Sequence, residues 1–95
     1  MSDKQFVLVV YDISVDRRRT KLHTALLDYG TPVQYSVFEC WLTAAQHKQM
    51  LAKIRKIIRP RKDHLRYYTL CGACVEKIQT TQVGEVTRLK EVMVI

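Results

Sequence analysis

Hydrophobic residues fill the segment from residue 6 to residue 11 without a break, and several of them are β-branched. This length and composition are typical of a strand that is buried on both faces. After Ser14 the apolar residues follow helical spacing, so we expect a helix over 16–29 that Gly30 and Pro32 end. Its buried face is formed by Leu22, Ala25, Leu26 and Tyr29. The pattern predicts a central strand followed by an amphipathic helix.

The middle of the chain continues with β-branched and aromatic residues over 33–42. This segment forms either one long strand or a short hairpin that reverses within residues 34–36. Thr43 and Gln46 have the spacing of a capping box, which predicts the start of a second helix, and Pro60 stops it. The apolar stripe of this helix is Met50, Leu51, Ile54, Ile57 and Ile58.

Two more strands are predicted at 65–70 and 75–79, on either side of a Cys-Gly-Ala-Cys turn. The order of strand, helix, strand or hairpin, helix and strand predicts an α+β fold. We expect a ferredoxin-like two-layer sandwich, in which two helices cover one face of a mainly antiparallel sheet.

The C-terminal part of the chain is polar and then closes on four apolar residues at 92–95. We expect a single domain over 1–95, in which residues 79–95 form a tether and a terminal strand. That strand either folds back onto its own sheet or pairs with a second copy of the chain. A chain of 95 residues buries only about 60 to 65% of its unfolded surface, so partner subunits are expected.

The charge of the chain points to polyanionic partners. Sixteen Lys and Arg against nine Asp and Glu give a formal net charge of +7, which favours nucleic acid. No apolar run approaches the roughly 20 residues that cross a bilayer, and the N-terminal residues lack the features of a signal peptide. We therefore expect a cytoplasmic protein without a membrane partner.

The chain has three cysteines, an odd number that argues against a disulfide framework. Cys71 and Cys74 have the two-residue spacing of a zinc knuckle or a redox pair, but no second pair follows and Cys40 is distant in sequence. We expect Gly72 to form a turn and the thiols to pack as small hydrophobic groups.

Asp12 follows the first strand directly, and a cluster of cations comes after it. A metal-binding acid beside phosphate-binding bases suits chemistry on nucleic acids. Alternatively, Asp12 caps or turns the chain into the first helix. Each chain offers only one acid so placed, so a second carboxylate would most simply come from a symmetry mate. The cations are Arg17, Arg18, Arg19 and Lys21.

A second basic region surrounds the end of the second helix. It is either an ordinary solvated helix face or, doubled by dimer symmetry, a path for duplex DNA. Its members are Lys53, Arg55, Lys56, Arg59, Arg61, Lys62 and Arg66.

With these elements placed, the sequence resembles the CRISPR-associated Cas2 family. The resemblance rests on Tyr11-Asp12-Ile13, on the basic start of the first helix, and above all on segments 28–30 and 33–40. It implies a ferredoxin-like homodimer, acting with the Cas1 integrase when new spacers are acquired. Two copies of Asp12 would face each other across the two-fold axis and share Mg²⁺ or another divalent ion.

The resemblance also implies functions for individual residues. The family is described both as metal-dependent endonucleases that hydrolyse RNA or DNA and as non-catalytic adaptors that bind duplex DNA. Asp12 would be the metal ligand and Asp12 with Tyr11 the catalytic residues, although Tyr11 and Phe38 also suit core positions. Val33 stands where some relatives carry a cation, which weakens the catalytic interpretation. The nucleic-acid-binding residues would be Arg17, Arg18, Arg19, Lys21 and Phe38.

A third possibility, a regulatory domain that senses small molecules, follows from the fold class alone. It predicts no affinity for nucleic acid.

Overall fold

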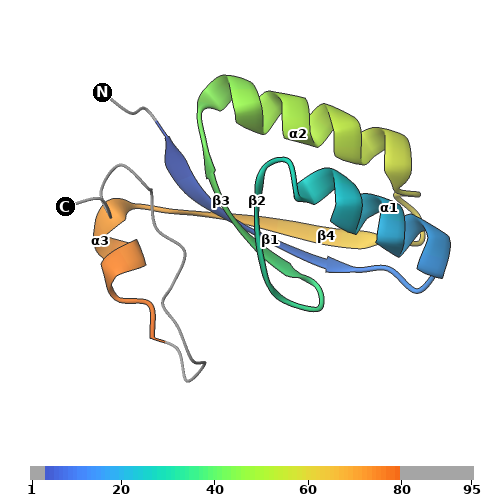
Figure 1. The fold of residues 1–95 in the computed structure, drawn as a ribbon, viewed down its shortest axis with the longest axis horizontal. Helices are drawn as coiled ribbons and strands as arrows, with labels where there is room; N and C mark the ends of the chain where they lie inside the picture. Colours follow the sequence, from blue (N-terminus) through green and yellow to red (C-terminus); the bar gives the residue numbers. More distant parts are fainter. Residues whose placement is uncertain (1–3, 80–95) are drawn as a thin grey trace.

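The computed structural model describes residues 4–79 (Figure 1). Its elements are β1 (Gln5–Asp12), α1 (Asp16–Leu26), β2 (Gly30–Gln34), β3 (Val37–Leu42), α2 (Ala44–Ile57), β4 (His64–Leu70) and α3 (Gly72–Glu76). The four strands form one sheet in the order β2-β3-β1-β4, and every neighbouring pair is antiparallel. The predicted ferredoxin-like fold is confirmed, and β1 is a central strand.

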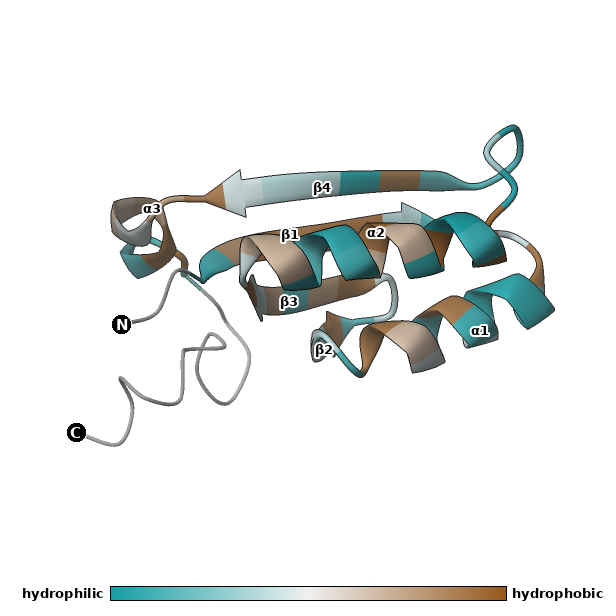
Figure 2. Cartoon of the chain, turned by 90° about the horizontal axis from the view of Figure 1, so that it is seen from above, coloured by the Kyte–Doolittle hydropathy of each residue, from teal (hydrophilic) through white to brown (hydrophobic). Residues whose placement is uncertain are grey.

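The core lies between one face of the sheet and the two long helices. Alternation along β1 directs Val7, Val9 and Tyr11 to this face, where all three are buried. The helices contribute Leu22 and Leu26 from α1 and Met50 and Ile54 from α2. Hydrophobic colour accordingly runs along β1 and β3, whereas the helices alternate between hydrophilic and hydrophobic residues (Figure 2).

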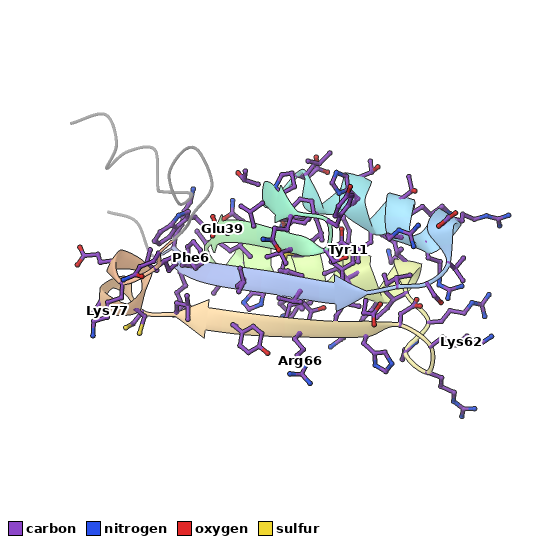
Figure 3. The ribbon with its side chains drawn as sticks, turned by 90° about the horizontal axis from the view of Figure 1, so that it is seen from below. Phe6, Tyr11, Glu39, Lys62, Arg66 and Lys77 are labelled. Atoms are coloured by element: carbon purple, nitrogen blue, oxygen red, sulfur yellow. The ribbon has the colours of Figure 1, made fainter. Side chains whose placement is uncertain are left out.

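The opposite face of the sheet is not covered by α1 or α2. Figure 3 shows β1 and β4 from this side, with the two helices behind them. Phe6 on this face is buried, but Leu8 and Val10 are only partly buried, so the prediction that β1 is buried on both faces holds in part. This uncovered face carries the alternate residues of β1, which include Asp12 at the end of the strand.

The first helix is shorter than predicted, because it ends at Leu26 and not at residue 29. Tyr29 still packs against the core, but it does so from the turn after the helix. Gly30 does not cap the helix; it begins β2 opposite Cys40. A Cβ at this position would collide with Cys40 Sγ and lie 2.5 Å from the Glu39 carbonyl oxygen. The close approach of β2 to β3 therefore requires glycine there.

The segment 33–42 is a hairpin, which was one of its two predicted forms. The chain reverses at Tyr35 and Ser36, between β2 and β3. Pro32 lies in β2, which is an edge strand and therefore tolerates a residue without an N–H donor.

The second helix begins at the predicted capping box. The Gln46 N–H donates to Thr43 Oγ1 at 3.1 Å, and the Thr43 N–H donates to Gln46 Oε1 at 2.9 Å. Both bonds satisfy backbone donors that the first turn of a helix leaves unpaired. α2 ends at Ile57, before Pro60 as predicted.

The prediction for the segment after β4 is wrong. Residues 72–76 form the short helix α3, not a turn followed by a strand at 75–79. Cys71 and Cys74 are exposed and do not pack as hydrophobic groups. The tether and terminal strand predicted within 79–95 lie, from residue 80 onward, outside the described residues. Within residues 4–79, no helix combines the length and the apolar character that crossing a bilayer requires.

Candidate metal and nucleic-acid site

Asp12 is the last residue of β1 and is exposed to solvent. It lies on the uncovered face of the sheet, opposite His64 of β4. The N-cap of α1 is Val15, which has no side-chain capping bond, so Asp12 does not cap that helix. The prediction that Asp12 caps this helix is therefore wrong, and its carboxylate is exposed at the end of the central strand β1.

The other aspartates of residues 4–79 are held by cations. Asp63 pairs with Arg18, Asp16 pairs with Arg19, and Asp28 pairs with Lys53. Asp12 forms no ion pair within these residues. The same part of the chain contains no group of three side chains able to hold a metal ion. Within residues 4–79, Asp12 is thus the one aspartate that no cation pairs with.

Tyr11 anchors the turn between β2 and β3 next to Asp12. Its hydroxyl donates to the Tyr35 carbonyl oxygen at 3.2 Å, and its backbone N–H donates to the Ser36 carbonyl oxygen at 3.0 Å. Burial raises the pKa of Tyr11, while the charge of Arg19 lowers it. With its side chain buried, Tyr11 positions the backbone beside Asp12 and does not reach solvent itself.

Tyr35 is a candidate site residue that the sequence analysis did not assign. Tyr35 is 97% exposed at the tip of the hairpin, and its backbone carbonyl oxygen is the one that accepts from the Tyr11 hydroxyl. An exposed aromatic ring is a platform on which a nucleic-acid base can stack. The possible reversal within 34–36 was the sequence feature that indicated this exposure, because side chains at a turn point away from the core.

Phe38 is fully buried, and this corrects its predicted contact with nucleic acid. Its ring centroid lies 5.1 Å from that of His23 and 6.4 Å from that of Tyr11. Phe38 therefore fills the space between β3 and α1, which was the alternative interpretation of this aromatic residue.

The cations at the start of α1 have different functions. Arg18 donates from Nε and Nη2 to the two carboxylate oxygens of Asp63, at 2.8 and 3.0 Å. Arg19 donates to the Ile13 carbonyl oxygen at 2.8 Å and pairs with Asp16. The structure thus corrects the assignment of Arg18 as a phosphate ligand, because its guanidinium is committed to Asp63. The exposed members of the cluster are Arg17 and Lys21.

Asp63 ties the loop between α2 and β4 to α1. Its side chain is shielded from solvent and also accepts a hydrogen bond from the Arg59 N–H at 2.8 Å. The paired Arg18 guanidinium, more than any other group, lowers the pKa of Asp63. This buried carboxylate holds the basic loop against the basic start of the helix.

A groove of about 1200 Å³ lies between the start of α1 and the end of α2. It brings together parts of the two basic clusters that are separate in the sequence. Lys53, Arg55 and Arg66 do not line it. Lys53 pairs with Asp28, and Arg66 lies on the uncovered face near the Tyr68 hydroxyl. The cations that line the groove are Arg17, Arg18, Lys21, Lys56, Arg59, Arg61 and Lys62. Apart from Arg18, which is paired with Asp63, these cations suit a phosphate backbone.

Lys62→Ala is expected to weaken duplex binding and to reduce the slope of log affinity against log salt by about 0.9. Lys62 and Lys77 are both exposed and lie at opposite ends of the molecule (Figure 3). Lys77→Ala is therefore a matched control that removes the same charge away from the groove. Fluorescence anisotropy over a range of salt concentrations measures both variants, and equal slopes would exclude the groove as the binding path.

Comparison with known proteins identifies the family. Residues 5–78 match the family model described as CRISPR associated protein Cas2. The chain belongs to the Cas2 family. A Cas2 relative from Chloroflexus aurantiacus, named CRISPR-associated endoribonuclease Cas2 1, is 44% identical over 75 residues, which cover 78% of this chain and 81% of the relative.

Two solved structures share the fold. The crystal structure of Streptococcus pyogenes Cas2 at pH 6.5 gives a TM-score of 0.73 at 30% identity, covering 81% of this chain and 99% of that one. A chain of a partial Cas6–RT–Cas1–Cas2 complex gives a TM-score of 0.74 at 28% identity, covering 90% and 99%. The predicted resemblance to Cas2 is confirmed.

Proposed function

We propose that this Cas2 protein is a Mg²⁺-dependent endonuclease that hydrolyses phosphodiester bonds of RNA or DNA in the cytoplasm, during the acquisition of new spacers. The observation that carries the proposal is Asp12, an exposed carboxylate at the end of a central strand without an ion pair in residues 4–79. Mg²⁺ prefers carboxylate oxygens and completes its shell with waters and phosphate oxygens.

The active unit in this proposal is a homodimer formed through the uncovered face of the sheet. Leu8 and Val10 of β1 and Val37 of β3 leave part of their apolar surface exposed on this face. Packing against a second copy would remove that surface from water. A two-fold axis beside the end of β1 would then bring two copies of Asp12 together around one ion.

Each chain would contribute residues with different functions to the site. Asp12 would hold the ion, which when bound would supply a Lewis acid for a phosphoryl oxygen and would lower the pKa of a water. Tyr11 fixes the neighbouring turn through its hydrogen bond to Tyr35, so the loops beside Asp12 keep one arrangement. Arg17 and Lys21 are exposed at the adjacent start of α1 and would hold the phosphates of the substrate.

The names of relatives support both nuclease activity and a Cas1 partner. The Chloroflexus relative is named an endoribonuclease, and one solved neighbour is part of an assembly that contains Cas1. The basic groove also supports the alternative function, a non-catalytic adaptor that binds duplex DNA within the Cas1 complex. In that case the basic surfaces and the C-terminal tail would bind DNA and the integrase, and Asp12 would be vestigial or structural.

Metal removal tests the proposal. Purified protein, freed rigorously from contaminating nucleases, is expected to cleave RNA or DNA with Mg²⁺, to lose all cleavage with EDTA, and to regain it when Mg²⁺ is restored. Gel analysis of end-labelled single-stranded RNA, single-stranded DNA and duplex DNA measures the substrate preference. If the wild type cleaves none of these substrates, the enzyme proposal is wrong and the adaptor function remains.

A further inference from the structure

Two cysteine thiols meet at the end of the sheet distant from the basic groove. Cys71 follows β4 directly, Cys74 lies one helical turn later in α3, and their Sγ atoms are 3.3 Å apart. Backbone bonds from the Val75 N–H to the Cys71 carbonyl oxygen, at 3.0 Å, and from the Lys77 N–H to the Cys74 carbonyl oxygen, at 3.1 Å, hold this turn. Sulfur atoms, drawn in yellow, lie beside α3 near Lys77 in Figure 3.

We infer that Cys71 and Cys74 form a redox-active dithiol, which exchanges with small-molecule disulfides and closes reversibly into an intramolecular disulfide. Both residues are exposed, so an oxidant reaches them without unfolding. The two sulfurs already face each other within one turn of backbone, and closing the bond needs only a small shift of the side chains.

The third cysteine, Cys40, is buried, unlike Cys71 and Cys74, and it packs as a structural residue. Cys40 is fully buried in the core, and burial raises the pKa of its thiol to about 12. It therefore reacts neither as a thiolate nor with a reagent in solution. A closed zinc site at the pair has no support, because residues 4–79 contain no group of three metal-ligating side chains.

The proposed exchange has two steps. The Cys71 thiolate attacks one sulfur of a disulfide RSSR, which forms a mixed disulfide and expels one RS⁻. The Cys74 thiolate then attacks Cys71 Sγ, which forms the Cys71–Cys74 bond and expels the second RS⁻. The two thiol protons pass through solvent to the two RS⁻, so two cysteines are oxidised and one RSSR is reduced to two RSH.

The environment of the two thiols supports this order. A hydrogen bond with the backbone of Cys74, followed by the hydrogen bond between the two thiols, lowers the pKa of Cys71. The same thiol–thiol hydrogen bond raises the pKa of Cys74. Cys71 is accordingly the attacking thiol, because its pKa is the lower of the two, and Cys74 is the resolving thiol. A lowered thiol pKa is common in Cys-X-X-Cys motifs.

Thiol counting in a redox titration tests the inference. The full chain is equilibrated without oxygen at different ratios of oxidised to reduced glutathione, quenched in acid, unfolded and alkylated, and its intact mass is measured. All three cysteines should be alkylated at the reducing end, and only one at the oxidising end. Peptide mapping should place that remaining adduct on Cys40.

Single substitutions provide the controls, and both Cys71 and Cys74 are exposed enough to be changed without disturbing the core. Cys74→Ser should accumulate a glutathione adduct on Cys71, because no resolving thiol remains. Cys40→Ala should still lose two alkylation sites on oxidation. The inference is wrong if the wild type keeps all three alkylation sites under oxidising glutathione, or if its disulfide forms only between two chains. Neither result bears on nuclease activity.

Discussion

Asp12→Asn is expected to lower Mg²⁺-dependent cleavage by at least about 100-fold while the fold remains intact. Substitutions in the outer shell of a metal site already cost about 10- to 100-fold, and this change removes the charge of the proposed direct ligand. The amide has the shape of the carboxylate, and Asp12 has no ion pair within residues 4–79 that the change would break. The measurement is the initial cleavage rate at saturating Mg²⁺, and light scattering checks that the variant and the wild type have the same oligomeric state.

Glu76→Gln is the matched control for this variant. Glu76 is exposed on α3, away from the end of β1, so the same loss of one negative charge should leave cleavage unchanged. Spacer acquisition with Cas1 separates the two proposed functions. If Asp12→Asn loses cleavage but keeps spacer acquisition, catalysis is dispensable for acquisition. If Asp12→Asn cleaves at the wild-type rate, Asp12 does not hold the metal ion.

Asp63→Asn is expected to lower the free energy of unfolding by about 2 to 3 kcal/mol. The substitution removes a charge that is shielded from solvent and accepts three hydrogen bonds, two from Arg18 and one from the Arg59 N–H. Urea unfolding at neutral pH, followed by circular dichroism, measures the loss. Asp28→Asn is the control, because Asp28 and Lys53 are more than half exposed and their ion pair should contribute little.

The same carboxylate should make stability depend on pH. Arg18 lowers the pKa of Asp63 from its usual value of 3.8, so the folded protein keeps this group charged to a lower pH than the unfolded chain does. The stabilisation is therefore complete above the unfolded pKa and is lost as pH falls below about 4 through the folded pKa. The wild type should lose more stability than Asp63→Asn between about pH 5 and pH 3, and parallel losses would contradict the buried pair.

Local patterns predicted the parts of the fold that local interactions hold. The capping box at Thr43 and Gln46 was correct because both of its bonds join residues three apart. The apolar run that became β1 predicted a central strand with Asp12 at its end, and both are confirmed. The segment at 72–76 was assigned wrongly, because so short an apolar run suits a strand or a helical turn equally.

Two residues of the candidate site could not be assigned correctly from local sequence patterns. The position of Asp12 at the end of β1 followed from the sequence, whereas the ion pair of Arg18 and the burial of Phe38 did not. Arg18 is neutralised by Asp63, which is 45 residues away along the chain, and Phe38 is covered by a helix that precedes it. Such partners are chosen by packing, so a basic or aromatic residue does not reveal its function from its own neighbours in sequence.

The sequence by itself determined the fold class, the family and the position of one acid beside many cations, because periodicity, capping and a long motif are encoded in neighbouring residues. Only the tertiary structure decided which cations remain available for phosphate, that two separate basic clusters line one groove, and that two thiols face each other. The first two outcomes depend on contacts between distant segments, such as the pairing of Arg18 in α1 with Asp63 in the loop before β4. The third depends on the short helix α3, which brings Cys71 and Cys74 within one turn where the sequence pattern had predicted a strand.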